Sequence, residues 1–404
     1  MLYSIGLILL LGIVAKGLFE RLKLPGLLGM LLLGVIIGPY ALNILDANTL
    51  AISADLRKFA LIVILLKAGL GINKDDLLKV GPAALKMAFI PCVIEGFFVA
   101  LASTVFLGFT LLEGGMLGFI VAAVSPAVVV PLMLKLQERR LGTNKGVPTL
   151  ILSGASVDDV VSITFLTVFI GLNLNQGGHM GVELLKIPIT ILGGIGMGAL
   201  AGLGLLQVFR RISFKDLDRI LILLATCILL TAIEAQLKPI VDISAYLAIM
   251  TLGFTINLKD PARSKRKSKA FNQIWGFAQI LLFVLVGAQV DVTVAMKAGL
   301  AGIILVAIGL VGRSLGVWLS TAGSALNKKE RLFAMMAYSP KATVQAAVAS
   351  LPLAAGLPSG QVILAIGVLS IILTAPLGAI LIKRYAPRLL VQEYEDMDRD
   401  VIQF

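Results

Sequence analysis

Charged residues are scarce in this chain. Only 14% of its 404 residues are Asp, Glu, Lys or Arg, whereas 58% are hydrophobic. Soluble proteins usually carry about 25% charged residues, so the composition excludes a soluble globular protein of this size. Apolar runs of about 20 residues, the length of a membrane-spanning helix, recur along the chain instead. The sequence therefore predicts an all-α polytopic membrane protein without a sizeable soluble domain.

Cysteine and histidine are nearly absent. Cys92 and Cys227 both lie in apolar segments, where free cysteines are commonly buried, and they form no disulfide framework or metal motif. The lone His179 lies in a Gly-rich loop and is expected to be solvated. Residues 1–19 lack a basic n-region and a clear cleavage site, so we interpret them as a retained first helix rather than a signal peptide.

Apolar segments predict about thirteen transmembrane helices. They are centred on residues 3–19, 25–41, 56–72, 82–108, 114–135, 146–172, 184–209, 217–235, 239–257, 272–290, 296–320, 331–356 and 360–384.

The positive charges predict the orientation of these helices. The formal net charge is +12, and the basic residues cluster in alternate short loops, most strongly within residues 260–269. Because basic loops tend to stay on the cytoplasmic side, we expect the N-terminus outside and the acidic C-terminal tail in the cytoplasm. This distribution argues against nucleic-acid binding, and the expected location is the cell (inner) membrane.

An odd number of spans permits an inverted repeat, with spans 1–6 matching spans 8–13 and span 7 as a linker. The motif SPAVVVP at 125–131 lies in span 5, and SPKATV at 339–344 lies in span 12. Proline disrupts the preceding helical turn, and paired interrupted helices mark the midplane ion site in inverted-repeat transporters. Ordinary proline kinks are the alternative. We expect two broken helices that cross near the middle of the membrane.

Two adjacent carboxylates, Asp158 and Asp159, lie within the apolar span 146–172. One carboxylate at the centre of a membrane helix costs roughly 2.5–3.5 kcal/mol, so a pair is expected to face a wet cavity. Adjacent carboxyl groups also raise each other's proton affinity. The pair therefore predicts exchange of a proton for a small hard cation.

Three more charges lie in the apolar segments. Glu95 in span 4 and Arg313 in span 11 occupy corresponding repeats, which favours a buried ion pair, although each could instead line a water cavity. Lys341 follows the proline of the second predicted break. It could neutralise half-helix C-termini or pair with one of the aspartates.

Seven strings, in this order, resemble the sodium/proton antiporters of the cation/proton antiporter superfamily, and are most similar to its NHA branch. They are KAGLGI from 67, SPAVVVP from 125, KGVPTL from 145, SVDD from 156, LLFVLVGAQV from 281, PKATVQAA from 340 and LSIILTAPLG from 369.

The resemblance implies the antiporter fold and a homodimer. Residues 1–75 and 215–292 would form dimerisation scaffold helices, residues 80–174 and 295–386 would form a mobile, ion-carrying core that moves like an elevator, and 184–210 would be the linker helix. The double-aspartate position matches Asp158 and Asp159, with Asp159 as the ion-binding carboxylate. One departure is Arg313, where many electrogenic members have lysine; the basic position of the second broken helix is retained as Lys341.

We therefore expect a sodium (or lithium)/proton antiporter in which Asp159 binds cation or proton in turn, with Asp158 beside it. The supporting positions are Ser125, Pro126, Ala127, Val128, Ser156, Lys341 and Thr343. Backbone carbonyls near the 125–131 break would supply further oxygen ligands. No GxxxxGK[ST] motif occurs, so coupling to ion gradients is expected, without a cofactor or a soluble partner.

Three alternatives differ from this interpretation. A potassium/proton antiporter would share the fold, since selectivity depends on the cavity. A sodium-coupled organic-solute carrier would share the repeats but would need a roomier site. An enzyme is disfavoured, because an intramembrane aspartyl protease would need its two aspartates on separate, facing helices.

Overall fold

The computed structural model describes residues 1–71, 82–174, 180–237, 243–259 and 261–392. His179 and the acidic tail therefore lie outside the described residues. Helices make up nearly all of the regular structure there, beside one isolated β-bridge between Leu141 and Gln392. The prediction of an all-α membrane protein is confirmed.

Each predicted span coincides with a helix or with a run of short helices. The first seven spans correspond to α1 (Leu2–Arg21), α2 (Gly26–Ile37), α4 (Ser53–Gly71, preceded by the short α3, Ala47–Ala51), α6 (Pro82–Phe106), α7 (Leu111–Ala122) with α8 (Pro126–Glu138), α9 (Val147–Leu174) and α10 (Met180–Arg211). The last six correspond to α11 (Asp216–Leu237), α12 (Ala245–Lys259), α13 (Pro261–Ala288), α14 (Val292–Ser320), α15 (Lys328–Ala337) with α16 (Thr343–Val348) and α17 (Leu351–Ala354), and α18 (Gly360–Leu389).

Within the described ranges, nine helical stretches are long and apolar enough to cross a membrane by themselves. Three further apolar stretches, α2, α12 and α16–α17, are shorter. The count of thirteen spans therefore stays a prediction, whereas the positions of the apolar segments agree with the helices.

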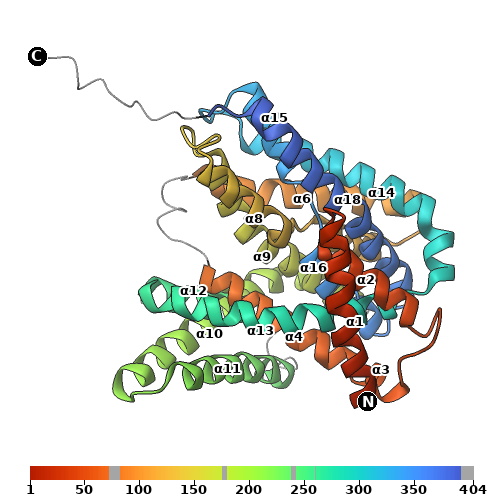
Figure 1. The fold of residues 1–404 in the computed structure, drawn as a ribbon, viewed down its shortest axis with the longest axis vertical. Helices are drawn as coiled ribbons and strands as arrows, with labels where there is room; N and C mark the ends of the chain where they lie inside the picture. The colour runs from red at the N-terminus through yellow and green to blue at the C-terminus, as the bar shows by residue number, and fades with distance from the viewer. Residues whose placement is uncertain (72–81, 175–179, 238–242, 260, 393–404) are drawn as a thin grey trace, which may run out of the picture.

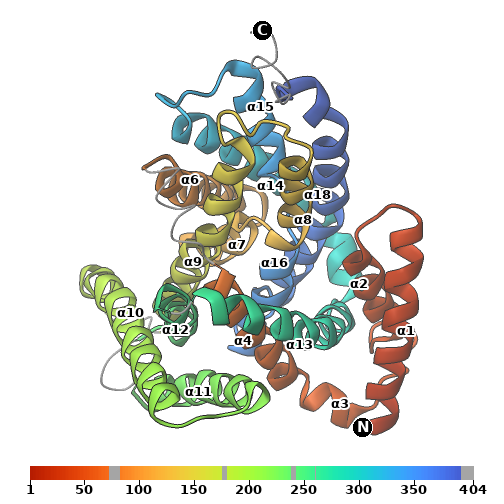
Figure 2. The same cartoon turned by 60° about the vertical axis from the view of Figure 1, so that its left-hand side comes forward.

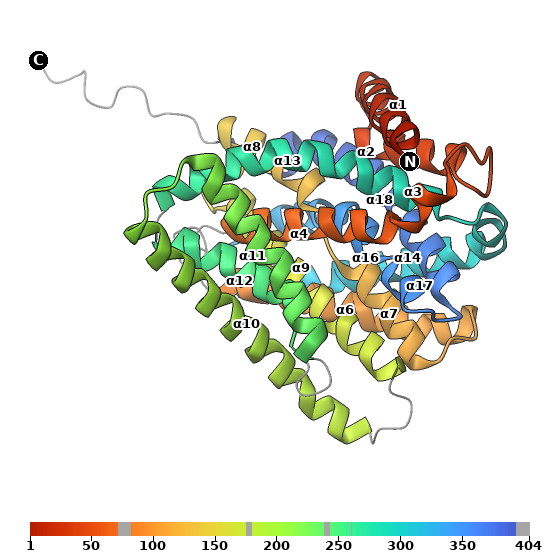
Figure 3. The same ribbon diagram turned by 90° about the horizontal axis from the view of Figure 1, so that it is seen from below.

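The helices form two bundles (Figure 1, Figure 2). One, here called the α13 bundle, contains α1–α4 and α10–α13. Figure 3 shows α4 and α13 running alongside each other, with α11 crossing them obliquely. The other, here called the α9 bundle, contains α6–α9 and α14–α18. The two bundles meet where α16 contacts α4 and α13, and where α9 contacts α10 and α12.

Glycines allow helices of the α13 bundle to pack so closely that the backbone of one helix contacts the backbone of the next. A Cβ atom at Gly34 of α2 would lie 2.0 Å from a carbonyl oxygen of α13, and one at Gly287 of α13 would lie 2.1 Å from a carbonyl oxygen of α2. Gly69 of α4 and Gly253 of α12 make the same kind of contact, at 2.2 and 2.9 Å. Small residues permit such close approach in membrane proteins.

These contacts follow the inverted repeat. If spans 1–6 match spans 8–13, then α2 corresponds to α12 and α4 to α13. The pair α2–α13 is therefore equivalent to the pair α12–α4, and both pairs use glycines on each side. In the α9 bundle the equivalent helices α6 and α14 pack against each other directly, where a Cβ at Gly316 would lie 2.4 Å from Pro91 Cα.

Replacing Gly287 by alanine should destabilise the protein by about 1–3 kcal/mol, because the added methyl group would overlap the α2 backbone, which cannot move aside cheaply. Gly276→Ala on the same helix is the matched control, because a Cβ atom added there would meet nothing within 4 Å. Thermal unfolding in detergent should show a lower midpoint for Gly287→Ala alone. Equal midpoints for the two variants would contradict the packing described here.

Candidate functional site

Two helices of the α9 bundle are interrupted. The first interruption comprises residues 123–125, between the end of α7 at Ala122 and the start of α8 at Pro126. The second separates the end of α15 at Ala337 from the start of α16 at Thr343. Both breaks were predicted, but the first is shorter than the 125–131 motif, since Pro131 lies inside α8. Pro126 occupies the first helical position, where proline's missing N–H has no consequence.

The two interruptions contact each other. The backbone N–H of Ser125 donates to the carbonyl oxygen of Pro340 at 2.8 Å. The hydroxyl oxygens of Ser125 and Thr343 lie 3.3 Å apart, and both side chains are buried. Ala127 and Val128 follow in the first turn of α8. The structure thus brings together supporting residues that are more than 200 positions apart in the chain.

A residue that the sequence reasoning did not single out joins the two breaks. The side-chain amide of Gln345 donates to the carbonyl oxygens of Ala123 at 2.6 Å, Ile120 at 3.2 Å and Val121 at 3.5 Å. Its side-chain oxygen accepts the N–H of Ala342 at 2.8 Å. Gln345 therefore satisfies carbonyl groups that the end of α7 would leave without partners. The only signal in the sequence was its place in the string PKATVQAA.

Asp158 lies beside the first interruption. One carboxylate oxygen accepts the backbone N–H of Val124 at 2.7 Å, and the other lies 3.4 Å from Nη1 of Arg313. Asp158 is fully buried. Ser156 lies half a turn earlier on α9, and its side chain is outside the described part of the structure. Helix α9 thus carries the acid pair to the point where the two broken helices cross.

Asp159 differs from every other acid in this region. It is 4% exposed, and its Oδ1 has no hydrogen-bond partner among the described residues. None of the ion pairs between described residues includes it. A buried ionised carboxylate without a partner is costly. Glu95 Oε1 also lacks a hydrogen bond, but Glu95 is already paired with Arg313 and Lys341. Asp159 is therefore the acid whose charge a proton or a bound cation would compensate.

Glu95 pairs with two basic side chains. Its Oε2 accepts from Nε of Arg313 and, at 2.7 Å, from Nζ of Lys341, and all three side chains are buried. The structure therefore places Glu95 and Arg313 together, as the ion-pair hypothesis required. It places Lys341 on Glu95, whereas the sequence left open a partner among the aspartates or the half-helix ends. The ring of Tyr338 lies 5.2 Å from the guanidinium carbon of Arg313, in cation–π contact.

Formal charges balance within this group, here called the charge cluster: Glu95, Asp158, Arg313 and Lys341. Two carboxylates face two cations, and Arg313 bridges both acids. Asp159 adds a third carboxylate next to a cluster that is already neutral. The arrangement thus leaves one buried acid, Asp159, outside the four charges that pair with one another.

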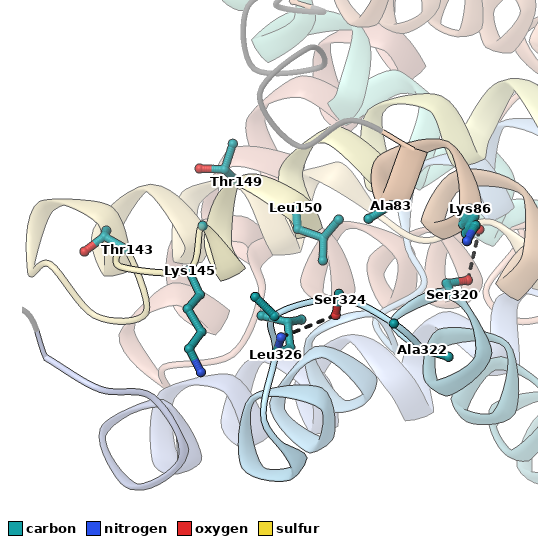
Figure 4. Close-up of a pocket in the computed structure, with 13 residues that line it drawn as sticks. Ala83, Lys86, Thr143, Lys145, Thr149, Leu150, Ser320, Ala322, Ser324 and Leu326 are labelled. Carbon is teal, nitrogen blue, oxygen red and sulfur yellow. Dashed lines mark hydrogen bonds between the residues drawn. The ribbon is translucent and has the colours of Figure 1, made fainter.

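A cavity of about 640 Å³ lies elsewhere in the α9 bundle (Figure 4). It is lined by the ends of α6, α9 and α14, including Lys86, Thr149 and Ser320, with Lys145 from the loop before α9. Neither the acid pair nor any member of the charge cluster lines it. We therefore place the candidate site at the crossing of the interrupted helices and not in this cavity.

Glu95→Ala and Arg313→Ala should each destabilise the protein by about 3–5 kcal/mol, because each leaves a buried charge uncompensated. The double variant should recover part of the summed loss, and the recovery should be incomplete because Lys341 still lacks its carboxylate partner. The measurement is a double-mutant cycle on thermal stability. Strictly additive losses would show that the two residues do not interact.

Comparisons with known proteins agree with this fold. The family model for the transmembrane sodium/hydrogen exchanger matches residues 6–386. The chain is 31% identical to human sodium/hydrogen exchanger 9B2, over 94% of this chain and 72% of that protein, and 34% identical to 9B2 of Xenopus tropicalis, over 95% and 74%.

A solved structure also shares the fold. The sodium proton antiporter MjNhaP1 from Methanocaldococcus jannaschii matches with a TM-score of 0.82 at 23% identity, covering 96% of this chain and 98% of that one. The antiporter fold that the resemblance implied is therefore confirmed. On the match over residues 6–386 and the identity to the 9B2 proteins, this chain belongs to the transmembrane sodium/hydrogen exchanger family.

Proposed function

We propose that this protein is a secondary active sodium/proton antiporter in which Asp159 binds a proton and a sodium or lithium ion in turn. The observation that carries the proposal is the state of Asp159. This buried carboxylate has one oxygen without a hydrogen bond and forms no ion pair among the described residues, and it lies beside a cluster whose charges already balance. Family membership and the names of the 9B2 relatives, which are sodium/hydrogen exchangers, support sodium and proton as the two ions.

The chemistry of exchange follows from competition for one group. A hard monovalent cation binds oxygen ligands, and the ionised Asp159 side chain supplies one. Protonation neutralises the same oxygen and releases the cation. Lower pH should therefore weaken the apparent affinity for sodium, since both ions cannot occupy Asp159 together. Ser125, Ser156 and Thr343 are the neighbouring positions from which further oxygen ligands would come.

The contacts between the bundles suggest how the site changes sides. Helices α9 and α16, which carry Asp159 and Gln345, contact the α13 bundle. We propose that the α9 bundle moves against the α13 bundle as an elevator, with α10 as the linker. In this arrangement the α13 bundle is the scaffold of a homodimer in the cell (inner) membrane, with the N-terminus outside and the C-terminus in the cytoplasm.

Potassium/proton exchange remains the second candidate, because the fold would be shared. A sodium-coupled organic-solute carrier is less well supported, since no member of the acid pair or the charge cluster lines the cavity of about 640 Å³. Cation-stimulated proton movement in proteoliposomes, compared among sodium, lithium, potassium and no added cation, distinguishes these candidates. Proton movement with potassium alone would replace the proposed substrate.

Asp159→Asn should abolish exchange without unfolding the protein, because an amide cannot take up or release a proton in this range. Asp158→Asn should impair exchange, since it weakens the contacts to Arg313 and to the Val124 N–H. Asp291→Asn is a control at the exposed N-cap of α14 and should exchange normally. The readout is sodium-driven proton movement by purified protein in liposomes, and full activity of Asp159→Asn would refute the assignment.

Exchange should be electroneutral. Arginine stays protonated in proteins, with a pKa above about 12, so Arg313 cannot carry a second proton. Asp158 is held by Arg313 and Lys341 by Glu95, which leaves Asp159 to carry one positive charge in each direction. A potassium diffusion potential set with valinomycin should change neither the rate nor the endpoint of sodium/proton exchange. A rate that follows the imposed voltage would contradict this stoichiometry.

A further inference from the structure

The carbonyl groups at the end of α7 are the natural extra ligands for a cation at the acid pair. Residues 120–123 end a half-helix, and its last carbonyl groups carry the negative end of the helix dipole. Asp158 reaches the same point through the Val124 N–H at 2.7 Å. Asp159 is the next residue of α9, so we take these carbonyl oxygens as the groups that would replace water ligands of a cation bound there.

In this structure those carbonyl groups are occupied. The Gln345 amide donates to Ala123 O at 2.6 Å, to Ile120 O at 3.2 Å and, at the limit of a hydrogen bond, to Val121 O at 3.5 Å. The amide has two N–H groups for three carbonyl oxygens. Each hydrogen bond to Gln345 withdraws electron density that a bound cation would otherwise use.

The orientation of the Gln345 amide is determined by its other end. Its oxygen accepts the Ala342 N–H at 2.8 Å, just before α16 begins, so the NH₂ group must face α7. The side chain is fully buried, with a partner for both its oxygen and its nitrogen. A buried amide satisfied at both ends is costly to withdraw. Gln345 therefore keeps its place when a cation enters.

We infer that Gln345 is a specificity-determining residue that limits the number of carbonyl ligands available to the transported cation and so favours sodium and lithium over potassium. The number and field strength of carbonyl ligands is one determinant of selectivity between potassium and sodium. A larger ion gathers more oxygen ligands, and the carbonyl groups bound by Gln345 are the ones it would lack. This inference rests on the proposed antiport function and refines its substrate.

The test is the ratio of apparent KM values for sodium and potassium, measured with proteoliposomes of the whole protein at one pH. Gln345→Leu keeps most of the volume but removes both donors. The potassium KM should fall toward the sodium KM, so that the wild-type preference for sodium shrinks at least tenfold. A merely structural role would lower kcat or stability and leave this ratio unchanged.

Ser162→Ala is the matched control. Ser162 on α9 is buried and donates to Phe119 O at 2.5 Å. The variant therefore removes one hydrogen bond to an α7 carbonyl group, that of the residue before the first one Gln345 binds. It should keep the wild-type ratio. If Gln345→Leu does not fold, Gln345→Glu keeps the chain length and offers a single donor when protonated. Its preference for sodium should weaken as the pH rises and that donor is lost.

The outcomes separate the two proposals. If the wild type moves no alkali cation against protons, the proposed function fails. If the wild type exchanges sodium but folded Gln345→Leu or Gln345→Glu keeps the wild-type ratio, only the role of Gln345 is refuted. An equal change of the ratio in Ser162→Ala would also refute it, because any loosening of α7 would then have the same effect.

Discussion

Charges and backbone ends buried in a membrane protein must find partners inside the protein, and the rest of this structure depends on that constraint. Water is absent from the hydrocarbon region, so each unsatisfied polar group costs several kcal/mol. The interrupted helices expose N–H and C=O groups in the middle of the α9 bundle, and buried side chains supply many of their partners. Asp158 accepts a hydrogen bond from the Val124 N–H, and the Gln345 side-chain amide donates to carbonyl groups at the end of α7.

The inverted repeat distributes these tasks unequally between its halves. The equivalent helices α6 and α14 supply opposite charges, Glu95 and Arg313, so the symmetry of the backbone produces a complementary pair of side chains. The equivalent interrupted helices also differ in their side chains. The α15–α16 segment supplies the donors Lys341 and Gln345, whereas the α7–α8 break supplies mainly backbone N–H and carbonyl groups. Because the groups at the two breaks differ, each break can satisfy polar groups of the other.

Much of this arrangement was predictable from the sequence. The positions of helices and breaks follow from local signals, whereas the side-chain partners depend on packing. Apolar length alone gave the positions of the helices, and the prolines at 126 and 340 gave the two interruptions, because both signals are local. The approach of Glu95 to Arg313 followed from the cost of isolated charges. The partner of Lys341 could not be predicted, since apolar spans contain three carboxylates and only packing selects Glu95. Gln345 was missed because an uncharged amide in an apolar helix has no electrostatic signature until its neighbours are known.

The choice of arginine at position 313 links this packing to coupling. Lysine is a single point charge on a flexible stem, whereas guanidinium offers five donors in a rigid fork. Arg313 uses this fork to reach Glu95 through Nε and Asp158 through Nη1, while Tyr338 covers its face. A lysine at this position has one ammonium group, so it could pair closely with Glu95 or with Asp158 but not reach both through separate nitrogens. Because Arg313 pairs with Asp158, only the other adjacent carboxylate, Asp159, is left to bind a proton or a cation in the proposed exchange. If exchange is electroneutral, as proposed, its stoichiometry follows from the hydrogen bonds that Arg313, which stays protonated, makes to Glu95 and Asp158.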